Sequence, residues 1–279
     1  MLGQMMHKGD AHLPMPLSPR LSIIAEEIAK SGYQDIIYDI CADHAYLSIY
    51  LLQNKICKTV AATDISHRSI IKARKNAEKR GIHIVDDITD GTCGIAIYEG
   101  DGFSCLPGYK AGKIVVIAGI GAESMIRIVS MGIDMARAAS MLIFQPMSSQ
   151  ELLRGWLMDN SFEICYERLA QEGDRIYSLL FCRPADKPQK YEPDDIFVGC
   201  GVKYRTEGEY IQFLLFTRRK IINRYKGLIA ARESKDTPNM GRSRADGDMP
   251  CIETAKLEAA VRRIDKYLQE LYENRSSCH

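Results

Sequence analysis

The chain has 279 residues, of which 46% are apolar and 26% are charged, and its net charge is +1. This is enough for one domain with a full hydrophobic core and a smaller appendage. No apolar run approaches the length that spans a bilayer and no signal-like segment is found, so we expect a soluble, cytoplasmic protein without a membrane partner. The nine cysteines form no C-x-x-C pair and no metal-like spacing with histidine. They are therefore expected to be reduced core thiols, with no metal site.

Charge is unevenly distributed along the chain. Residues 1–202 carry 21 Lys and Arg against 25 Asp and Glu, whereas residues 203–279 carry 16 against 11. The two parts are therefore expected to have different roles or different partners. The excess of positive charge in the C-terminal part indicates a polyanion as its partner.

The N-terminal residues 1–17 show no periodicity, and we expect them to form a flexible tail. A helix is predicted for residues 18–32, because Ser18 suits an N-cap, Pro19 suits the first turn and apolar residues then recur at helical spacing.

Short apolar segments then alternate with amphipathic ones. The predicted strands are residues 35–40, 59–63, 94–102, 113–121 and 139–146, and the predicted helices are residues 44–54, 66–81 and 148–159. Nearly continuous apolar strands separated by amphipathic helices are typical of a parallel sheet covered on both faces. Residues 162–184 read as two strands around a Glu-Gly-Asp turn, which would add an antiparallel edge. We therefore predict an α/β doubly wound sheet, mostly parallel.

The pattern changes in the C-terminal part of the chain. Apolar pairs recur every seven residues between 211 and 229, and apolar residues alternate at spacings of four and three between 257 and 271. Both patterns are typical of coiled-coil helices, and the polar loop 232–251 between them favours an antiparallel hairpin. The expected domains are residues 18–188 for the sheet and 189–279 for a linker and the helical hairpin.

Polar and glycine residues follow the predicted strands, where a doubly wound sheet binds its ligand. These residues are Asp39 with Cys41-Ala42-Asp43-His44, Asp64, Gly100-Asp101-Gly102, Gly119-Ile120-Gly121-Ala122, and Gln145-Pro146. The carboxyl ends of parallel strands share one edge of a sheet, so these residues form the candidate site.

The acidic residues indicate which ligand the site accepts. Asp64 suits a pair of ribose hydroxyls, since a carboxylate accepts both hydrogen bonds, and Asp101 between glycines can reach an adenine amine. Asp39 and Asp43 repel a pyrophosphate, which disfavours NAD and favours S-adenosylmethionine (SAM) with its sulfonium and ammonium groups. Each residue also has a structural alternative: an acid as a helix cap or turn former, and His44 as a helix-start residue bonded to backbone.

Several segments together resemble the TrmK-like tRNA (adenine(22)-N(1))-methyltransferase family. They are "DICADHAYL", "GDGF", "IAGIGAESMI" and "FQPM", with "LSPRL" near the start and "EGDRIYSLLFCRP" near the end of the sheet. The similarity covers about residues 17–205, and the heptad helices resemble the family's helical tail. It implies a class I methyltransferase (Rossmann-like) fold, SAM as cofactor, and methylation of an adenine N1 in tRNA. The chain departs from the family at Cys41 and Ala122, where the family has Gly, and at Met147, where it has Asn.

The strand-end residues and the resemblance together give the candidate site residues. Those expected to bind the cofactor are Arg20, Asp39, Cys41, Asp43, His44, Asp64, Ile65, Asp101, Gly102, Ala118 and Gly119. Those expected at the methyl-transfer centre are Asp43, Tyr46, Gly119 and Gly121. Adenine N1 has a free lone pair, so alignment is the main task of the enzyme. Asp43 either stabilises the cationic product or only binds SAM, and Tyr46 either stacks on a flipped adenine or is a core residue.

Basic residues on the first heptad helix are expected to contact tRNA phosphates. They are Arg218, Arg219, Lys220, Arg224 and Lys226, and the alternative is a solvated helix face. Two other functions stay open, namely a SAM-binding adaptor for RNA with little catalysis, and a methyltransferase for another RNA or a small molecule. We expect a monomer.

Overall fold

The computed structural model describes residues 15–88, 91–191, 195–199, 207–233 and 252–276. The chain divides into two compact units, one of residues 1–190 with 201–203 and one of residues 191–200 with 204–279. Most of the expected N-terminal tail lies outside the described residues. Met15, which falls within the expected tail, is buried in the core of the first unit, where its backbone N–H donates to the side chain of Gln53.

The first unit is built on an eight-stranded sheet in the order β3-β4-β2-β1-β5-β6-β8-β7. The strands are β1 (Gln34–Ile40), β2 (Cys57–Asp64), β3 (Ile84–Val85), β4 (Gly94–Glu99), β5 (Ile114–Ile120), β6 (Met141–Pro146), β7 (Phe162–Glu172) and β8 (Arg175–Pro184). β1 to β6 are parallel, whereas β8 runs antiparallel to both β6 and β7. The predicted parallel sheet with an antiparallel edge is confirmed.

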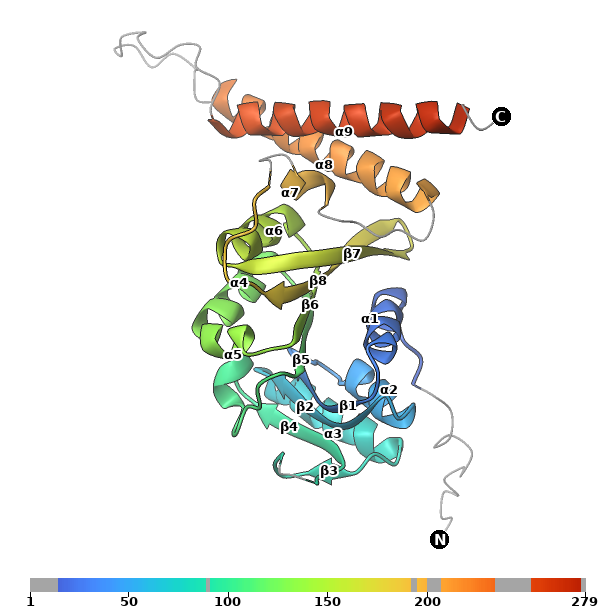
Figure 1. Ribbon diagram of the computed structural model, residues 1–279, viewed down its shortest axis with the longest axis vertical. Coiled ribbons are helices and arrows are strands. Elements are labelled where there is room, and N and C mark those ends of the chain that lie inside the picture. Colours follow the sequence, from blue (N-terminus) through green and yellow to red (C-terminus); the bar gives the residue numbers. More distant parts are fainter. Residues whose placement is uncertain (1–14, 89–90, 192–194, 200–206, 234–251, 277–279) are drawn as a thin grey trace. The chain divides into compact units, whose positions relative to one another are not determined.

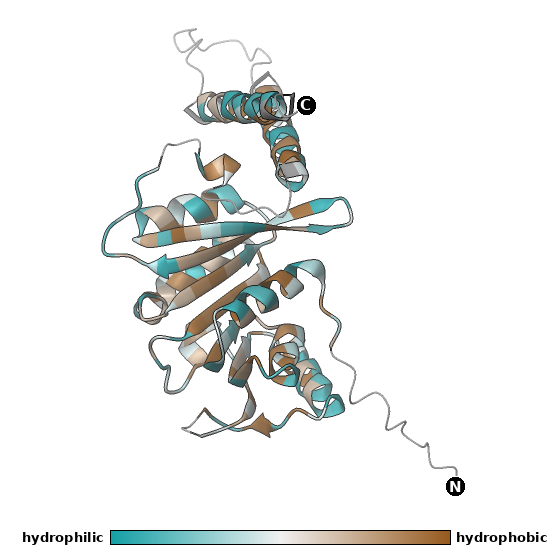
Figure 2. Ribbon diagram, turned by 45° about the vertical axis from the view of Figure 1, so that its right-hand side comes forward, coloured by the Kyte–Doolittle hydropathy of each residue, from teal (hydrophilic) through white to brown (hydrophobic). Residues whose placement is uncertain are grey.

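Helices cover both faces of this sheet (Figure 1). α1 (Pro19–Lys30), α2 (Tyr46–Gln53) and α3 (His67–Lys79) lie on one face. On the other lie α4 (Ala122–Met131), α5 (Ile133–Arg137) and α6 (Gln150–Asp159), with the 3-10 turn η2 (Gly102–Cys105) beside α4. The central strands are apolar without alternation because both faces are covered, and Figure 2 shows hydrophobic colour along them.

The antiparallel edge is tied to α6 by a buried ion pair. The guanidinium of Arg154 binds both carboxylate oxygens of Glu167 on β7, at 2.9 and 2.8 Å, and also the hydroxyl of Ser178 on β8 at 2.9 Å. Arg154, Glu167 and Ser178 are all fully buried. Because each charge is paired, replacing only one partner would leave a buried charge uncompensated and destabilise the edge.

The second unit consists of α7 (Asp195–Val198), α8 (Glu207–Glu233) and α9 (Ile252–Ser276). Arg218 on α8 pairs with Asp265 on α9, and Tyr225 on α8 bonds Glu258 on α9. Tyr225 follows Arg218 by seven residues on α8, whereas its partner Glu258 precedes Asp265 by seven residues on α9. The two helices therefore pack antiparallel. Most of the expected loop 232–251 lies outside the described residues.

The contact between α8 and α9 is apolar, as the heptad spacing predicts. Leu214 and Ile221 on α8 are buried, as are Leu257 and Ile264 on α9. Leu215, which follows Leu214, is exposed at 40%. One residue of that pair is therefore buried and the other is not. Over the described residues, no helix has the length and apolarity that crossing a membrane requires.

Candidate active site

A cavity of about 420 Å³ opens beyond the carboxyl ends of β1, β2 and β5, beside the start of α1. It lies where the sheet order reverses, because β2 follows β1 on one side and β5 lies on the other. Its lining contains nine of the predicted site residues: Arg20, Asp39, Cys41, Asp43, His44, Tyr46, Asp64, Ala118 and Gly119. It also contains Ala42 and Ile120, which lie within the predicted strand-end segments, and three residues that the sequence did not single out: Leu21, Leu47 and Ser69.

The loop between β1 and α2 has an unusual backbone. Cys41, Asp43 and Ala45 all have positive φ, at 61°, 48° and 57°. Non-glycine residues in this region each cost on the order of 1–3 kcal/mol and persist only where the surroundings enforce them. Such strain is concentrated at functional sites, and here it lies at the wall of the cavity.

Asp64 at the end of β2 holds this loop in place. Its Oδ2 accepts a hydrogen bond from the backbone N–H of Asp43 at 3.0 Å, and its Oδ1 accepts one from the N–H of Ser66 at 2.8 Å. Each carboxylate oxygen has a second lone pair, so Asp64 can accept two further hydrogen bonds from a ligand. Ser66 in turn caps α3, where its hydroxyl accepts from the N–H of Ser69.

Asp39 is the buried acid of the site. Its carboxylate accepts a hydrogen bond of 2.5 Å from the hydroxyl of Ser48 on α2, and the residue is only 4% exposed. Burial is the main cause that raises the pKa of Asp39 from 3.8 to about 6, and the charge of Asp64 adds to it, while the bonds from Ser48 oppose the rise. A nearby cation would stabilise the ionised form of this group.

Asp43 is the exposed acid of the site, with 64% of its side chain accessible. Its Oδ1 accepts a hydrogen bond from the Ser69 hydroxyl at 2.9 Å and lies 3.3 Å from Nε2 of His44. The His44 ring packs edge-on against Tyr46, with ring centres 5.6 Å apart. Tyr46 is 42% exposed, so the core position considered for it from the sequence is wrong.

The end of β5 is shaped by a glycine. Gly119 has φ 82°, and the register between β5 and β6 shifts between Ala118 and Ile120. A glycine in the left-handed region is typical of such a bulge. Its N–H donates to the side-chain oxygen of Gln145 at 3.1 Å, and a Cβ at this position would meet no atom within 4 Å. The bulge therefore turns an open backbone position to the cavity.

Arg20 is the cationic side chain of the lining, near the start of α1. Its Nη1 lies 2.8 Å from the sulfur of Met147, and its backbone N–H donates to Glu172 at 3.2 Å. Its guanidinium also lies over the ring of Tyr177, 5.6 Å from the ring centre. Glu172 and Tyr177 come from the antiparallel edge, which the sequence did not connect with the site.

Other predicted site residues do not line the cavity: Ile65, Asp101, Gly102 and Gly121. Asp101 is engaged by Arg127 on α4 through bonds of 2.5 and 3.1 Å, and Arg127 lowers the pKa of that carboxyl. Gly102 has φ 60°, and a Cβ there would come within 2.8 Å of Ile128, which accounts for glycine. Gly121 is the N-cap of α4, and a Cβ there would lie 3.3 Å from the hydroxyl oxygen of Ser148.

The basic residues expected to contact RNA are placed differently along α8. Arg218 pairs with Asp265 at 2.6 Å, so its charge is already balanced, and Lys220 lies over the ring of Phe216. Arg219, Arg224 and Lys226 are exposed.

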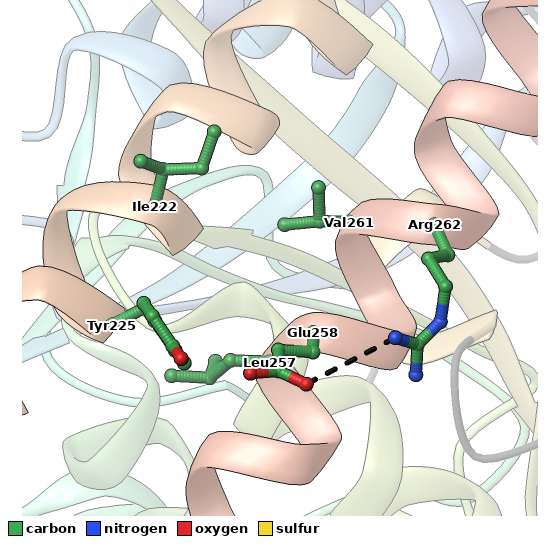
Figure 3. Close-up of a pocket in the computed structure, with 6 residues that line it drawn as sticks. All are labelled: Ile222, Tyr225, Leu257, Glu258, Val261 and Arg262. Carbon is green, nitrogen blue, oxygen red and sulfur yellow. Dashed lines mark ion pairs between the residues drawn. The ribbon is translucent and has the colours of Figure 1, made fainter.

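Another hollow, of about 290 Å³, lies between α8 and α9 (Figure 3). Its lining is Ile222, Tyr225, Leu257, Glu258, Val261 and Arg262. Its walls are mainly apolar, and Glu258 and Arg262 form an ion pair at 3.9 Å along α9. Within the described residues, no group of three or more His, Cys, Asp or Glu side chains is arranged to hold a metal ion.

Comparison with known proteins shows which family this chain resembles. A model described as "Methyltransferase domain" matches residues 17–180. A Mycoplasma genitalium protein provisionally named a tRNA methyltransferase is 30% identical over 185 residues, which cover 66% of this chain and 77% of that protein. The tRNA (adenine(22)-N(1))-methyltransferase of Bacillus subtilis is 26% identical over 185 residues, covering 66% and 72%.

Solved structures share the fold along nearly the whole chain. Streptococcus pneumoniae Sp1610, provisionally described as a tRNA (m1A22) methyltransferase, matches with a TM-score of 0.68 at 20% identity, covering 91% of this chain and 100% of that one. M. capricolum TrmK, solved with S-adenosyl-homocysteine, matches with a TM-score of 0.62 at 24% identity, covering 91% and 98%. The resemblance read from the sequence is confirmed, and so is the Rossmann-like methyltransferase fold.

Proposed function

Because the chain belongs to the methyltransferase-domain family, we propose that it transfers a methyl group from SAM to N1 of an adenine in tRNA. The observation that carries this proposal is the charge pattern of one cavity. Three carboxylates, those of Asp39, Asp43 and Asp64, and one guanidinium, that of Arg20, line the space beyond the sheet's reversal point.

These side chains fit the groups that SAM carries. Its carboxylate matches Arg20, its two ribose hydroxyls match the free lone pairs of Asp64, and its ammonium and sulfonium groups match Asp39 and Asp43. The adenine amine of SAM was expected to bind Asp101. That residue lies outside the cavity lining, and Arg127 already binds both oxygens of its carboxylate. Cys41 stands where the family has Gly, and it has a left-handed backbone with φ 61°, a conformation that glycine adopts readily.

SAM, held by these residues, would supply an electrophilic methyl group. The chain's own task is then to align an adenine and to exclude other nucleophiles. N1 of adenine attacks with its free lone pair and needs no base beforehand. The product would be cationic, and the exposed carboxylate of Asp43 supports a role in stabilising it or in accepting a proton from its amino group.

Asp43 is oriented for this role by its neighbours. The Ser69 hydroxyl and His44 Nε2 both approach the same oxygen, Oδ1, which leaves Oδ2 for the substrate. Tyr46 presents an exposed aromatic ring close by and offers a stacking surface for a base taken out of its helix. The bulge at Gly119 bounds the same space with backbone alone.

The experiment combines methyl transfer with mapping of the product. The purified protein is incubated with bulk tRNA and SAM carrying a labelled methyl group, and the modified base is located by the stop that N1-methyladenine causes in reverse transcription. We expect label in tRNA and a stop at an adenine. SAM binding without transfer to any RNA would instead support the adaptor function, and transfer to another base would overturn the proposed acceptor.

A further inference from the structure

Arg20 in the cavity lining is contacted by side chains from the antiparallel edge of the sheet. Of the described residues that line the cavity, Arg20 is the one arginine or lysine. Its side chain is 23% exposed, and its Nε is buried with no hydrogen-bond partner among the described residues. A guanidinium that is so enclosed needs other groups to set its position, because it has lost most of its contact with water.

Glu172 supplies the charge that faces Arg20. One oxygen, Oε1, accepts a hydrogen bond from the backbone N–H of Arg20 at 3.2 Å and lies 3.7 Å from its Nε. Arg20 is in the first turn of α1, where backbone N–H groups have no partner within the helix. A single carboxylate thus caps α1 and attracts the guanidinium of the same residue.

Tyr177 supplies the surface on which the guanidinium rests. The ring centre lies 5.6 Å from Arg20 Cζ, within the range of a cation–π contact, and Tyr177 is 7% exposed. In the β7–β8 register Tyr177 pairs with Ala170, and Glu172 lies two residues beyond Ala170 on the same strand. Because side chains alternate along a strand, Glu172 and Tyr177 face the same side of the hairpin, and that side packs against α1.

We propose that Glu172 and Tyr177 are positioning residues that hold the Arg20 guanidinium where it binds the carboxylate of the cofactor. The inference rests on the proposed SAM-dependent function and extends it to the far edge of the sheet. The β7–β8 hairpin would then take part in cofactor binding, although β6 separates it from β5 and the point where the strand order reverses.

The test uses two probes that differ in the amino-acid part. S-adenosyl-homocysteine carries the carboxylate, and 5′-methylthioadenosine lacks the whole amino-acid chain. Both are titrated by calorimetry into the full-length protein and into Glu172→Gln, Tyr177→Leu, Tyr177→Phe and Arg20→Ala. Glu163→Gln is the matched control, since it breaks an ion pair with Arg183 on the same hairpin away from Arg20.

We expect Glu172→Gln and Tyr177→Leu to weaken S-adenosyl-homocysteine binding by about three- to tenfold and to leave 5′-methylthioadenosine binding unchanged, as the loss of one charged or cation–π contact predicts. Tyr177→Phe keeps the ring and should bind like the wild type, as should Glu163→Gln. In the double variant Arg20→Ala, Glu172→Gln, the second change should add no further loss, because both act through one guanidinium.

Several outcomes would overturn the inference. Equal losses for both probes would mean that the hairpin only supports the fold, and full additivity in the double variant would mean that Glu172 acts independently of Arg20. If Tyr177→Leu fails to fold, Tyr177→Phe still tests the inference. This variant keeps the ring, so a loss of S-adenosyl-homocysteine affinity would show that the hydroxyl and not the ring is responsible. A wild-type protein that binds neither probe would overturn the proposed function together with this inference, whereas binding of both without discrimination among variants would overturn the inference alone.

Discussion

The backbone N–H of Asp43 donates a hydrogen bond to Oδ2 of Asp64 at 3.0 Å, so an acid at the end of β2 fixes the loop that follows β1. The other oxygen of Asp64 holds Ser66 at the start of α3. One side chain thus joins two of the segments that wall the cavity and still keeps lone pairs for a ligand.

Replacing Asp64 should weaken SAM binding. We expect Asp64→Ala to cost on the order of 1–3 kcal/mol of binding free energy, because the ribose hydroxyls and the N–H of Asp43 lose their acceptor. Calorimetric titration with SAM measures this change. Asp35→Ala, which removes an exposed acid paired with Lys113, is the control and should bind normally. An Asp64→Ala affinity equal to that of the control would contradict the assignment.

Replacing Asp43 separates catalysis from cofactor binding. Asp43→Asn keeps the shape and a hydrogen bond to Ser69 but removes the charge that stabilises a cationic product. We expect single-turnover methyl transfer to tRNA at saturating SAM to slow by about 10²-fold or more, with a smaller loss of SAM affinity. Ser69→Ala, which leaves the charge in place, should slow transfer less. A near-normal rate of Asp43→Asn at saturating SAM would show that Asp43 is a cofactor ligand only.

The left-handed backbone at Cys41 predicts a difference in stability between two small replacements. Cys41→Gly and Cys41→Ala both remove the sulfur, but only glycine adopts φ 61° without a steric cost. We expect Cys41→Gly to be more stable than Cys41→Ala by about 1 kcal/mol. Chemical denaturation of the two variants measures this difference. Equal stabilities would mean that the loop relaxes and stores no strain at this residue.

The raised pKa of Asp39 predicts a pH dependence of stability. Burial brings this pKa from 3.8 to about 6, so between these values the folded state binds more protons than the unfolded chain. The free energy of unfolding should therefore fall as pH rises through this window, with an Asp39 contribution on the order of 3 kcal/mol. Asp39→Asn should remove this contribution and be relatively more stable at pH 8 than at pH 5. Thermal unfolding of both proteins at the two pH values measures it, and parallel pH profiles would contradict it.

The placement of charges on α8 predicts how tRNA binding depends on salt. Arg219 and Lys226 are exposed, whereas Arg218 is paired with Asp265. If the first two contact phosphates, the double variant Arg219→Gln, Lys226→Gln should lower the slope of log affinity against log salt by about 1–2 units. Filter binding over a range of salt concentrations measures the slope. Arg218→Gln is the matched control and should change it little, and an unchanged slope in the double variant would argue for a protein-docking role of the helices.

Much of the fold was predictable because its signals are local. Strands such as β1, β2 and β5 are continuous apolar runs, and the acids Asp39 and Asp64 lie at their ends, so sheet and ligand edge could both be read from spacing. The two-residue strand β3 was missed because it is too short to show a period.

Other parts of the site depend on contacts that spacing does not encode. The left-handed loop was hidden because its residues are not glycines, and the bond between Arg127 and Asp101 joins residues on separate elements. Arg20 and Glu172 lie 152 positions apart, and their contact follows only from how the final hairpin packs on α1. A pairing of acid and base across that distance has no signature in the sequence.

The bond between Asp64 and the loop after β1 also explains why this Rossmann-like turn differs in ligand preference from dinucleotide-binding turns. In those proteins the first turn keeps its backbone N–H groups free for the oxygens of a pyrophosphate. In this chain the N–H of Asp43 already donates to the carboxylate of Asp64, and the N–H of Ala42 donates to the carbonyl of Thr63. The turn therefore has two fewer backbone N–H groups to offer a pyrophosphate, and the carboxylate of Asp64 beside it would repel one.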